Sequence, residues 1–440
     1  MEPTFNVAIC GGGNLAHGCA ATIGHRNKHF NINVLSRRPQ VWSNTITAYT
    51  HGSSWEKYGA LQGRLNLVSA DPSAIVVGAD LILICSPAHT KPEILNQIKP
   101  YLKRGAVIGT VFGQGAFDWQ ACSILGHDLI QEKNLTIFSL QYVPFICKVI
   151  NYGQDIRIIG PKKTLYAAAY PVEKVHYVCN ALSQSFFLPC VPIPSFLNLT
   201  LCPSNQIIHP GRVTGFFEKF PEQCNKVFKK KDVPLLYEHL DQRSADEIQA
   251  LDDEIQAIKR AILRACPEVN LDQVMPMKDR ICTMYADQVT DPTNLKTVFN
   301  TNAGYKHVPF PMIPVEGQDL KNIPAGEELV KLNLNARFFW EDLPYGLVIL
   351  KDIGNIVGVE TPVITRNIIF HQRFMPIKYV DETTGALIDE VVKAQTGAPS
   401  AYGITTMEEL VRTSLAVSGK AAGDDNIFFN KRVAPARARL

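Results

Sequence analysis

A glycine-rich turn near the start of the chain has the spacing of a phosphate-binding site. Gly11, Gly13 and Ala16 follow the apolar run Phe5–Cys10 and match the pattern G-x-G-x-x-G/A of dinucleotide-binding turns. This arrangement predicts a strand, a tight turn and a helix over residues 14–25. Backbone N–H groups and the positive end of the helix dipole would then face a pyrophosphate, although an ordinary strand-to-helix turn is the alternative. The predicted cofactor contacts of this turn are Gly11, Gly13, Asn14, Leu15 and Ala16.

Three polar residues, Ser36, Arg37 and Arg38, lie at the end of the second expected strand, residues 32–36. In dinucleotide-binding folds an acidic residue at this place binds the ribose 2′-hydroxyl, whereas an arginine accommodates a 2′-phosphate. No acidic residue lies nearby, and guanidinium groups pair well with phosphate. We therefore predict that these three residues bind the cofactor and that NADP(H) is favoured, with NAD(H) and a solvated basic loop as alternatives.

Further loops follow expected strands at the edge where parallel sheets bind ligands. They are residues 86–88, 112–115 and 143–147. From the first we predict that Ser86 and Pro87 contact the cofactor. Gln114, between two glycines, could donate a hydrogen bond to a substrate carboxylate or carbonyl, or could face water. Cys147 could contact the substrate, or could be a small buried hydrophobic residue.

His209, which precedes Pro210, is the histidine best placed for proton transfer. Hydride transfer to a carbonyl or imine needs a proton donor that titrates near neutrality, a group that holds this donor, and a cation for a substrate carboxylate. Histidine is the usual donor. His209 follows a proline-rich segment, where a cleft between two domains is expected. A purely structural histidine is the alternative.

The order of expected elements indicates an α/β fold. Strands are expected at residues 65–69, 81–85, 106–111 and 135–141, and a helix at 90–101. Strands that alternate with helices predict a doubly wound parallel sheet of the Rossmann type. Late strands are expected at 156–159 and 187–191. Prolines 189, 192 and 194 then mark a boundary, so the expected domains are residues 1–195, which bind the dinucleotide, and 196–440.

The second half of the chain is expected to be mainly α-helical. Ser244 and Glu247 have the spacing of a capping box, and an apolar stripe at helical spacing follows them. Thr361 with Pro362, and Thr405 with Glu408, predict further helix starts. The residues of the stripe are Ile248, Leu251, Ile255, Ile258 and Ile262.

Composition excludes several classes of function. The chain has 440 residues and a formal net charge of +3, which does not suggest a nucleic-acid partner. Its 11 cysteines show neither metal-ligand spacing nor a disulfide framework. The cysteine pattern therefore predicts no metal site and fits a reducing, cytoplasmic compartment. We expect no membrane segment, because no run of about 18 apolar residues occurs. Ala438-Arg439-Leu440 resembles a relaxed peroxisomal signal or is a chance basic tail. The oligomeric state is not predicted.

Several blocks of sequence, in their order and separation, resemble the opine dehydrogenase family, octopine and nopaline dehydrogenases included. The blocks are Cys10-Gly11-Gly12-Gly13-Asn14, Gly113-Gln114-Gly115-Ala116-Phe117, Ile208-His209-Pro210, Asn300-Thr301-Asn302 with Tyr305-Lys306, and Arg337 to Gly346. Members of this family reductively join the amino group of an amino acid to an α-keto acid, commonly pyruvate, through an imine and with NAD(P)H. The resemblance implies this activity here, with small-molecule substrates as the partners.

The resemblance also implies three catalytic residues. His209 resembles the catalytic histidine, Asp342 the carboxylate that orients it, and Arg337 the arginine beside it. Arg337 would bind the keto-acid carboxylate as a bidentate partner. Asp342 would fix the tautomer of His209 and favour the imidazolium. The separation of Arg337 and Asp342 predicts a loop or extended segment, and a simple turn with a surface ion pair is the alternative.

Two departures leave alternatives open. The Arg37 and Arg38 pair differs from what an NADH-using octopine dehydrogenase needs. The segment 201–204 carries a proline and a cysteine before His209, so the amino-acid donor is not fixed. An NADPH-dependent reductase of 2-keto acids without amine condensation is a second interpretation. A non-catalytic NADP(H)-binding protein is a third, and it predicts that His209, Arg337 and Asp342 lie far apart.

Overall fold

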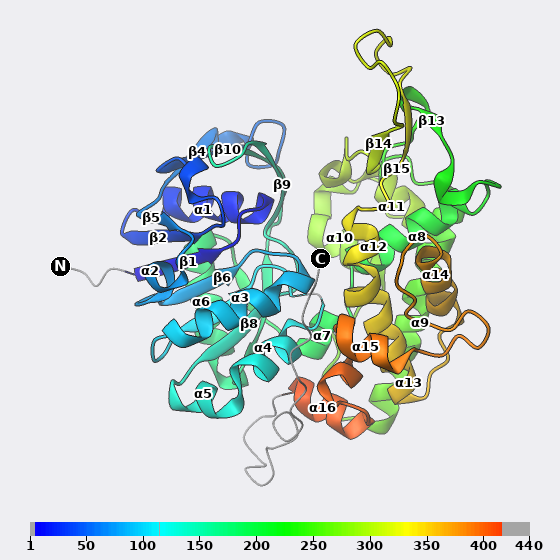
Figure 1. Ribbon diagram of the computed structural model, residues 1–440. Helices are drawn as coiled ribbons and strands as arrows, with labels where there is room; N and C mark the ends of the chain where they lie inside the picture. The colour runs from blue at the N-terminus through cyan, green and yellow to red at the C-terminus, as the bar shows by residue number, and fades with distance from the viewer. Residues whose placement is uncertain (1–4, 114, 416–440) are drawn as a thin grey trace. The chain divides into compact units, whose positions relative to one another are not determined.

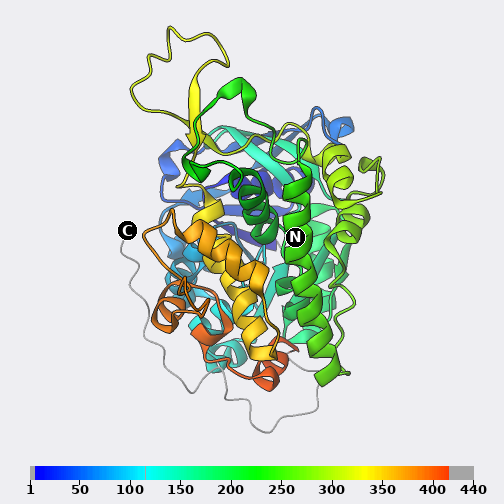
Figure 2. The same ribbon diagram turned by 90° about the vertical axis from the view of Figure 1, so that its right-hand side faces the viewer.

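The structure, a computed structural model, describes residues 5–113 and 115–415 (Figure 1). Gln114 and the tripeptide 438–440 lie outside the described residues. The chain divides into two compact units. The first comprises residues 5–200, 268–273 and 402–415 of the described chain, and the second comprises residues 201–267 and 274–401. Figure 2 shows the same ribbon turned by 90° about the vertical axis.

An eight-stranded sheet forms the centre of the first unit. Its order is β12-β11-β8-β7-β6-β1-β2-β5. Neighbouring strands are parallel except β8 and β11, which are antiparallel. The predicted Rossmann-type sheet is confirmed, with its last two strands reversed in direction. The strands are β1 (Phe5–Cys10), β2 (Phe30–Leu35), β5 (Leu67–Ser69), β6 (Leu81–Ile84), β7 (Val107–Thr110), β8 (Thr136–Leu140), β11 (Leu165–Tyr170) and β12 (Cys190–Pro192).

A second, four-stranded sheet in the same unit was not expected from the sequence. Its order is β4-β3-β10-β9, and β9 and β10 form an antiparallel hairpin. The expected loop at 143–147 is therefore wrong in part, because Phe145 to Cys147 belong to β9, and the expected strand at 156–159 lies in this sheet. The strands are β3 (Thr45–Tyr49), β4 (Ala60–Arg64), β9 (Phe145–Asn151) and β10 (Asp155–Pro161).

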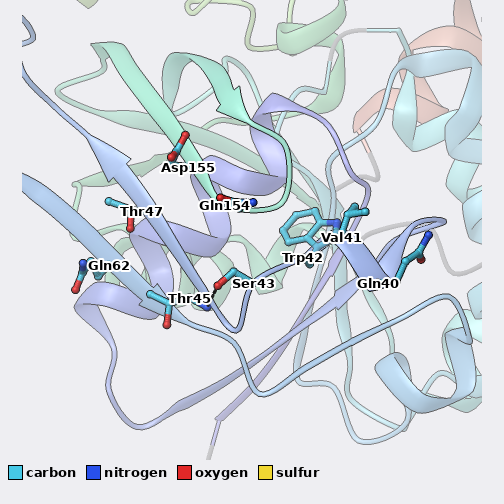
Figure 3. A pocket seen from close by; sticks show the side chains of 9 residues that line it. All are labelled: Gln40, Val41, Trp42, Ser43, Thr45, Thr47, Gln62, Gln154 and Asp155. Carbon is cyan, nitrogen blue, oxygen red and sulfur yellow. Dashed lines mark hydrogen bonds between the residues drawn. The ribbon is translucent and has the colours of Figure 1, made fainter.

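Small residues let this second sheet approach the first helix, α1 (Asn14–Arg26). A Cβ atom added to Gly63 would lie 2.2 Å from the carbonyl oxygen of Ala20, and one added to Gly18 would lie 2.4 Å from the ring of Phe145. A pocket of about 630 Å³ opens on the sheet, and none of the predicted site residues line it (Figure 3). Its lining residues are Gln40, Val41, Trp42, Ser43, Thr45, Thr47, Gln62, Gln154 and Asp155.

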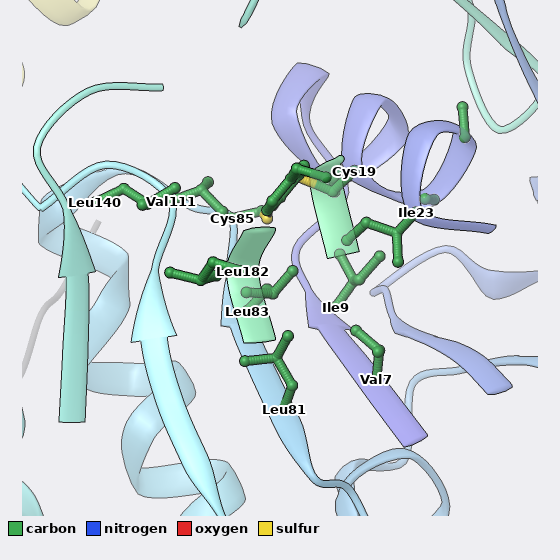
Figure 4. Close-up of a cluster of buried hydrophobic side chains, with 14 of the residues drawn as sticks. Val7, Ile9, Cys19, Ile23, Leu81, Leu83, Cys85, Val111, Leu140 and Leu182 are labelled. Carbon is green, nitrogen blue, oxygen red and sulfur yellow. Dashed lines mark hydrogen bonds between the residues drawn. The ribbon is translucent and has the colours of Figure 1, made fainter. Parts of the chain in front are cut away.

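Helices cover both faces of the large sheet, so the predicted doubly wound arrangement is confirmed. Successive residues of β1 point to opposite faces: Val7 and Ile9 enter one buried cluster, whereas Ala8 and Cys10 enter the other. Figure 4 shows the first cluster, where Ile23 of α1 and Leu182 of α6 cover the sheet. The helices are α1 and α6 (Val175–Phe186) on one face, and α2 (Pro72–Val76), α3 (Lys91–Ile98), α4 (Phe117–Leu125) and α5 (His127–Glu132) on the other.

The second unit is mainly helical, as predicted. Its longest element, α9, is the long green helix of Figure 2. The helices are α8 (Asn205–Phe217), α9 (Gln242–Ala265), α10 (Met277–Tyr285), α11 (Leu295–Thr301), α12 (Arg337–Trp340), α13 (Val348–Val357), α14 (Pro362–Gln372) and α15 (Asp389–Gln395). Two further helices, α7 (Phe196–Thr200) and α16 (Met407–Leu415), belong to the first unit. A small sheet of order β13-β15-β14 adds β13 (Phe228–Lys229), β14 (Met312–Pro314) and β15 (Leu329–Leu332).

The predicted stripe of α9 is confirmed, because all five of its apolar residues are fully buried. Its predicted N-terminal cap is wrong. The carboxylate of Asp241 accepts a hydrogen bond of 2.9 Å from the backbone N–H of Ser244, and the helix begins at Gln242. Aspartate is as good an N-cap as serine, and here it lies three residues earlier in the chain.

We predict that buried His371 makes the stability of the protein depend on pH. Burial lowers the pKa of His371 to about 4, against about 6.5 in an unfolded chain. The unfolded state therefore binds more protons between these values, so the free energy of unfolding falls as the pH drops through this window. From pH 7 to pH 5 the wild type should lose about 2 kcal/mol more than His371→Gln, as measured by urea unfolding. Equal losses in both proteins would show that His371 is not held neutral.

Candidate active site

The glycine turn between β1 and α1 fits a dinucleotide pyrophosphate. Gly11 has a φ of +141°, and a Cβ atom there would lie 2.5 Å from the carbonyl oxygen of Cys85. A Cβ atom on Gly13 would meet nothing within 4 Å, so the turn leaves open space at this position. Among the described residues, no side chain caps the N-terminus of α1 and no acidic residue lies in its first turn. Its N–H groups and helix dipole therefore favour an anion.

A buried histidine that sequence reasoning missed braces this turn. The Nδ1 of His17 lies 2.9 Å from the carbonyl oxygen of Gly13, and its Nε2 accepts a hydrogen bond of 2.8 Å from the backbone N–H of Gly153. Its ring also stacks on Trp42, with 4.1 Å between ring centres. Burial lowers the pKa of His17, so the ring is neutral and its Nδ1 donates to Gly13. Nothing in the sequence distinguishes this histidine from an ordinary core residue.

Two arginines lie exposed beyond the carboxyl end of β2. Ser36 is buried, and its hydroxyl accepts hydrogen bonds from the Nε1 of Trp42 at 3.1 Å and the backbone N–H of Arg38 at 3.3 Å. The guanidinium of Arg38 lies 4.0 Å from the ring centre of Tyr152. Within the described chain Arg37 forms no ion pair. Ser36 therefore orders the loop, and the two guanidinium groups are accessible to a phosphate.

The other predicted residues of the first unit follow β6 or belong to the second sheet. Ser86 and Pro87 follow β6 and precede α3. Cys147 lies in β9, where its thiol donates to the backbone carbonyl of Asn14 at 3.5 Å and where burial raises its pKa. This contact joins the second sheet to the first residue of α1. Contact between Cys147 and a substrate stays a prediction.

In the second unit the structure brings two predicted catalytic residues together. The Nδ1 of His209, in α8, lies 2.7 Å from the Oδ2 of Asp342. The two side chains are 8% and 4% exposed, so water screens their interaction poorly. The ring of Phe338 stacks on the imidazole, with 3.8 Å between ring centres and 17° between the planes. The carboxylate accepts a hydrogen bond from Nδ1–H, so Nε2 is the nitrogen that can exchange a proton with another group.

Arg337 belongs to the same short segment as Asp342. The expectation of a loop or extended chain here is wrong in part, because Arg337 begins the short helix α12, whereas Asp342 lies in a two-residue turn between α12 and a π-helix at Leu343–Leu347. The N–H of Asp342 donates to the carbonyl of Arg337 at 3.1 Å. This bond closes the turn at the end of α12, before the π-helix begins. The Arg337 side chain is 59% exposed and pairs through its Nε with the carboxylate of Glu341.

Close packing against α8 holds the π-helix in place. A Cβ atom on Gly346 would lie 2.4 Å from the Cβ of Gln206, so only glycine allows this approach. Gln206 precedes His209 by nearly one turn of α8. The contact therefore fixes the distance between the helix that carries His209 and the segment that carries Asp342.

A second partner of His209 is Tyr237, which sequence reasoning also missed. Its hydroxyl lies 2.9 Å from the Nε2 of His209. Tyr237 lies between α8 and α9, outside regular structure, and the buried Arg212 orders this segment. The guanidinium of Arg212 donates to the carbonyls of Leu236 and His239, each at 3.0 Å. No local motif marks Tyr237, since the contacts that place it come from a residue 25 positions away in the chain.

Comparisons with known proteins match both the region around the candidate site and nearly the whole chain. The model of the family described as NAD/NADP octopine/nopaline dehydrogenase, alpha-helical domain, matches residues 192–375. That range includes His209, Arg337 and Asp342. Tauropine dehydrogenase of Arabella iricolor is 26% identical over 421 residues, which cover 92% of this chain and 99% of the relative.

Two solved structures extend the likeness to the fold. Octopine dehydrogenase with NADH and L-arginine has a TM-score of 0.76 at 23% identity and covers 96% of this chain and 100% of its own. Yersinopine dehydrogenase with NADP⁺ has a TM-score of 0.55 at 15% identity and covers 94% and 98%.

The chain is therefore similar to opine dehydrogenases over most of its length, and the helical domain of that family is matched by residues 192–375. Among the residues that the structure describes, no helix has the length and hydrophobicity of a membrane span, and no group of three or more His, Cys, Asp or Glu side chains is placed to hold a metal ion.

We predict that Arg212 stabilises the second unit without touching substrate. Its fully buried guanidinium also donates to the carboxylate of Asp241 at 2.9 Å. Arg212→Met should lower the free energy of unfolding by about 3–5 kcal/mol, because it leaves a carboxylate and several carbonyls without their donor. The matched control is Arg243→Met, whose side chain is 53% exposed and pairs with Glu218. The control should lose no more than about 1 kcal/mol in urea unfolding. Similar losses in both variants would contradict this role.

Proposed function

We propose that the protein is an NAD(P)H-dependent opine dehydrogenase that condenses an α-keto acid, pyruvate in the first instance, with the amino group of an amino acid. The observation that carries the proposal is the hydrogen bond between His209 and Asp342, with Arg337 on the same segment as the carboxylate. The relatives named above act on, or are complexed with, ligands of this chemistry. A non-catalytic protein predicts that His209 and Asp342 lie far apart, and the 2.7 Å contact speaks against it.

Each residue has a defined task in this proposal. Arg337 binds the keto-acid carboxylate through the guanidinium nitrogens that Glu341 leaves free, and so aligns the carbonyl. His209 assists the addition of the neutral amine and the loss of water, and then supplies the proton that the imine nitrogen gains. Asp342 holds the imidazole and stabilises its positive charge. The nicotinamide, when bound, supplies the hydride for the imine carbon.

The cofactor that we favour is NADP(H), with NAD(H) as the alternative. The turn at Gly11 and Gly13 suits the pyrophosphate of either. Arg37 and Arg38 support a 2′-phosphate, because they are exposed at the end of β2, where no acidic side chain is available for a ribose hydroxyl. The scattered free cysteines support a cytoplasmic location.

The deciding experiment is a matrix of keto acids and amines, followed by the absorbance of NADPH and of NADH. We expect oxidation of the cofactor that depends on both a keto acid and an amino acid. A plain keto-acid reductase would oxidise the cofactor without any amine, and that result would reject the condensation.

The same assay tests the role of His209. His209→Ala should lower kcat by at least about 100-fold, the order expected when a general acid–base is removed. Its affinity for the cofactor should stay within about 2-fold, because the glycine turn lies in the other unit. The matched control is His307→Ala, whose side chain is 85% exposed. If His209→Ala retained full turnover, another residue would have to supply the proton.

We predict that Arg37 sets the preference between the two cofactors. Arg37→Asp should shift the ratio of kcat/KM for NADPH over NADH toward NADH by at least about 10-fold, since a charge-assisted pair is replaced by repulsion. Arg104→Asp, an exposed arginine of the same unit, is the control and should leave the ratio unchanged. An unaltered ratio in Arg37→Asp would reject the argument for the 2′-phosphate.

A further inference from the structure

Both ring nitrogens of His209 are already occupied by protein groups. Nδ1 pairs with Asp342 at 2.7 Å, and Nε2 lies 2.9 Å from the hydroxyl of Tyr237. Phe338 covers one face of the ring, and the whole residue is 7% exposed. A proton can therefore leave Nε2 for a substrate in only two ways: Tyr237 moves aside, or its hydroxyl carries the proton.

The packing of Tyr237 opposes displacement. Its ring centre lies 4.8 Å from that of Tyr305 and 6.0 Å from that of Phe299, and the residue is 9% exposed. Arg212 holds the carbonyls of Leu236 and His239 on either side of it. Moving the hydroxyl away from Nε2 would also leave buried polar atoms unpaired, at a cost of about 1–3 kcal/mol.

The hydroxyl of Tyr237 can both give and accept a proton. Beside neutral His209 its O–H donates to Nε2, because the Nδ1 proton is held by Asp342. Beside the imidazolium its oxygen accepts from Nε2–H, which frees its own hydrogen for another acceptor. Burial raises the pKa of Tyr237, and Tyr305 and Asp342 raise it further, so the residue remains a neutral phenol throughout.

We propose that Tyr237 is a catalytic residue that carries the proton from Nε2 of His209 to the substrate nitrogen. The Nε2–H bond breaks as a new O–H bond forms, and the original O–H bond breaks as the N–H bond of the product forms. Tyr237 is neutral before and after, His209 returns to neutral imidazole, and the hydride supplied by the cofactor completes the reduction of C=N. This inference rests on the proposed function.

The test compares Tyr237→Phe with Tyr305→Phe. Both variants remove one hydroxyl from the same aromatic cluster, and only the first removes a partner of His209. In Tyr237→Phe we expect kcat to fall by about 10- to 100-fold, with KM for the keto acid and the cofactor Kd within about 3-fold of wild type. Tyr305→Phe should keep kcat within about 3-fold.

Two further readouts separate a relay from a residue that only positions His209. The proton inventory of kcat for the wild type, measured in mixtures of H2O and D2O, should be curved because two protons move together. In the free protein, the ¹⁵N resonance of the His209 Nε2 should shift in Tyr237→Phe and stay in place in Tyr305→Phe.

Each contrary result has its own meaning. An unchanged or raised kcat in Tyr237→Phe would show that the hydroxyl is off the proton route or merely covers Nε2, and would overturn the relay. A linear proton inventory would likewise overturn it, by assigning Tyr237 to positioning alone. If the Nε2 resonance did not shift in Tyr237→Phe, the hydrogen bond between Tyr237 and His209 would not exist in solution, and the relay would be overturned. Absence of amine-dependent oxidation in the wild type would instead reject the proposed function, and the resonance test would still stand.

Discussion

The buried guanidinium of Arg212 is the interaction on which the candidate active site depends. A charged group that is fully removed from water needs acceptors for its protons, or the cost of burial is not recovered. Arg212 finds them in the segment between α8 and α9, at Leu236, His239 and Asp241. Because Arg212 and His209 share one helix and are three residues apart, the segment that satisfies the charge is also held beside the histidine. The position of Tyr237 thus follows from the hydrogen bonds that the Arg212 guanidinium makes on either side of it.

Glycine contacts provide the close packing that this arrangement requires. A Cβ atom on Gly211 would lie 2.8 Å from the side chain of Ile248, and one on Gly215 would lie 2.5 Å from the Cα of Ser244. Both glycines belong to α8 and face α9, four residues apart along one side of the helix. Together with Gly346 on the π-helix, these glycines allow α8 to pack closely against α9 on one side and against the π-helix on another. Rigid packing of this kind keeps the hydrogen bonds of His209 short.

The sequence was sufficient where a feature depends on neighbours in the chain. The spacing of small residues predicts the turn at Gly11 and Gly13. Local patterns of apolar residues predict the parallel sheet and the stripe of α9. Features set by distant partners were not predictable. The second sheet pairs β3 with β10, which are far apart in sequence, and the N-cap at Asp241 serves Arg212 as well as α9. The π-helix at Leu343–Leu347, directly after Asp342, is a rare form and was not expected from the sequence.

Three histidines are buried in the part of the chain that the structure describes: His17, His209 and His371. All three lie on helices, so burial and helical position do not distinguish His209, the one that the sequence singled out. Their hydrogen-bond partners do. His17 and His371 each place Nδ1 against the carbonyl four residues earlier, an acceptor without net charge that cannot offset a buried positive ring. His209 places Nδ1 against the carboxylate of Asp342, which can. Among these three rings only that of His209 pairs with a carboxylate, and this difference, rather than burial or position on a helix, supports the catalytic role that we propose for His209.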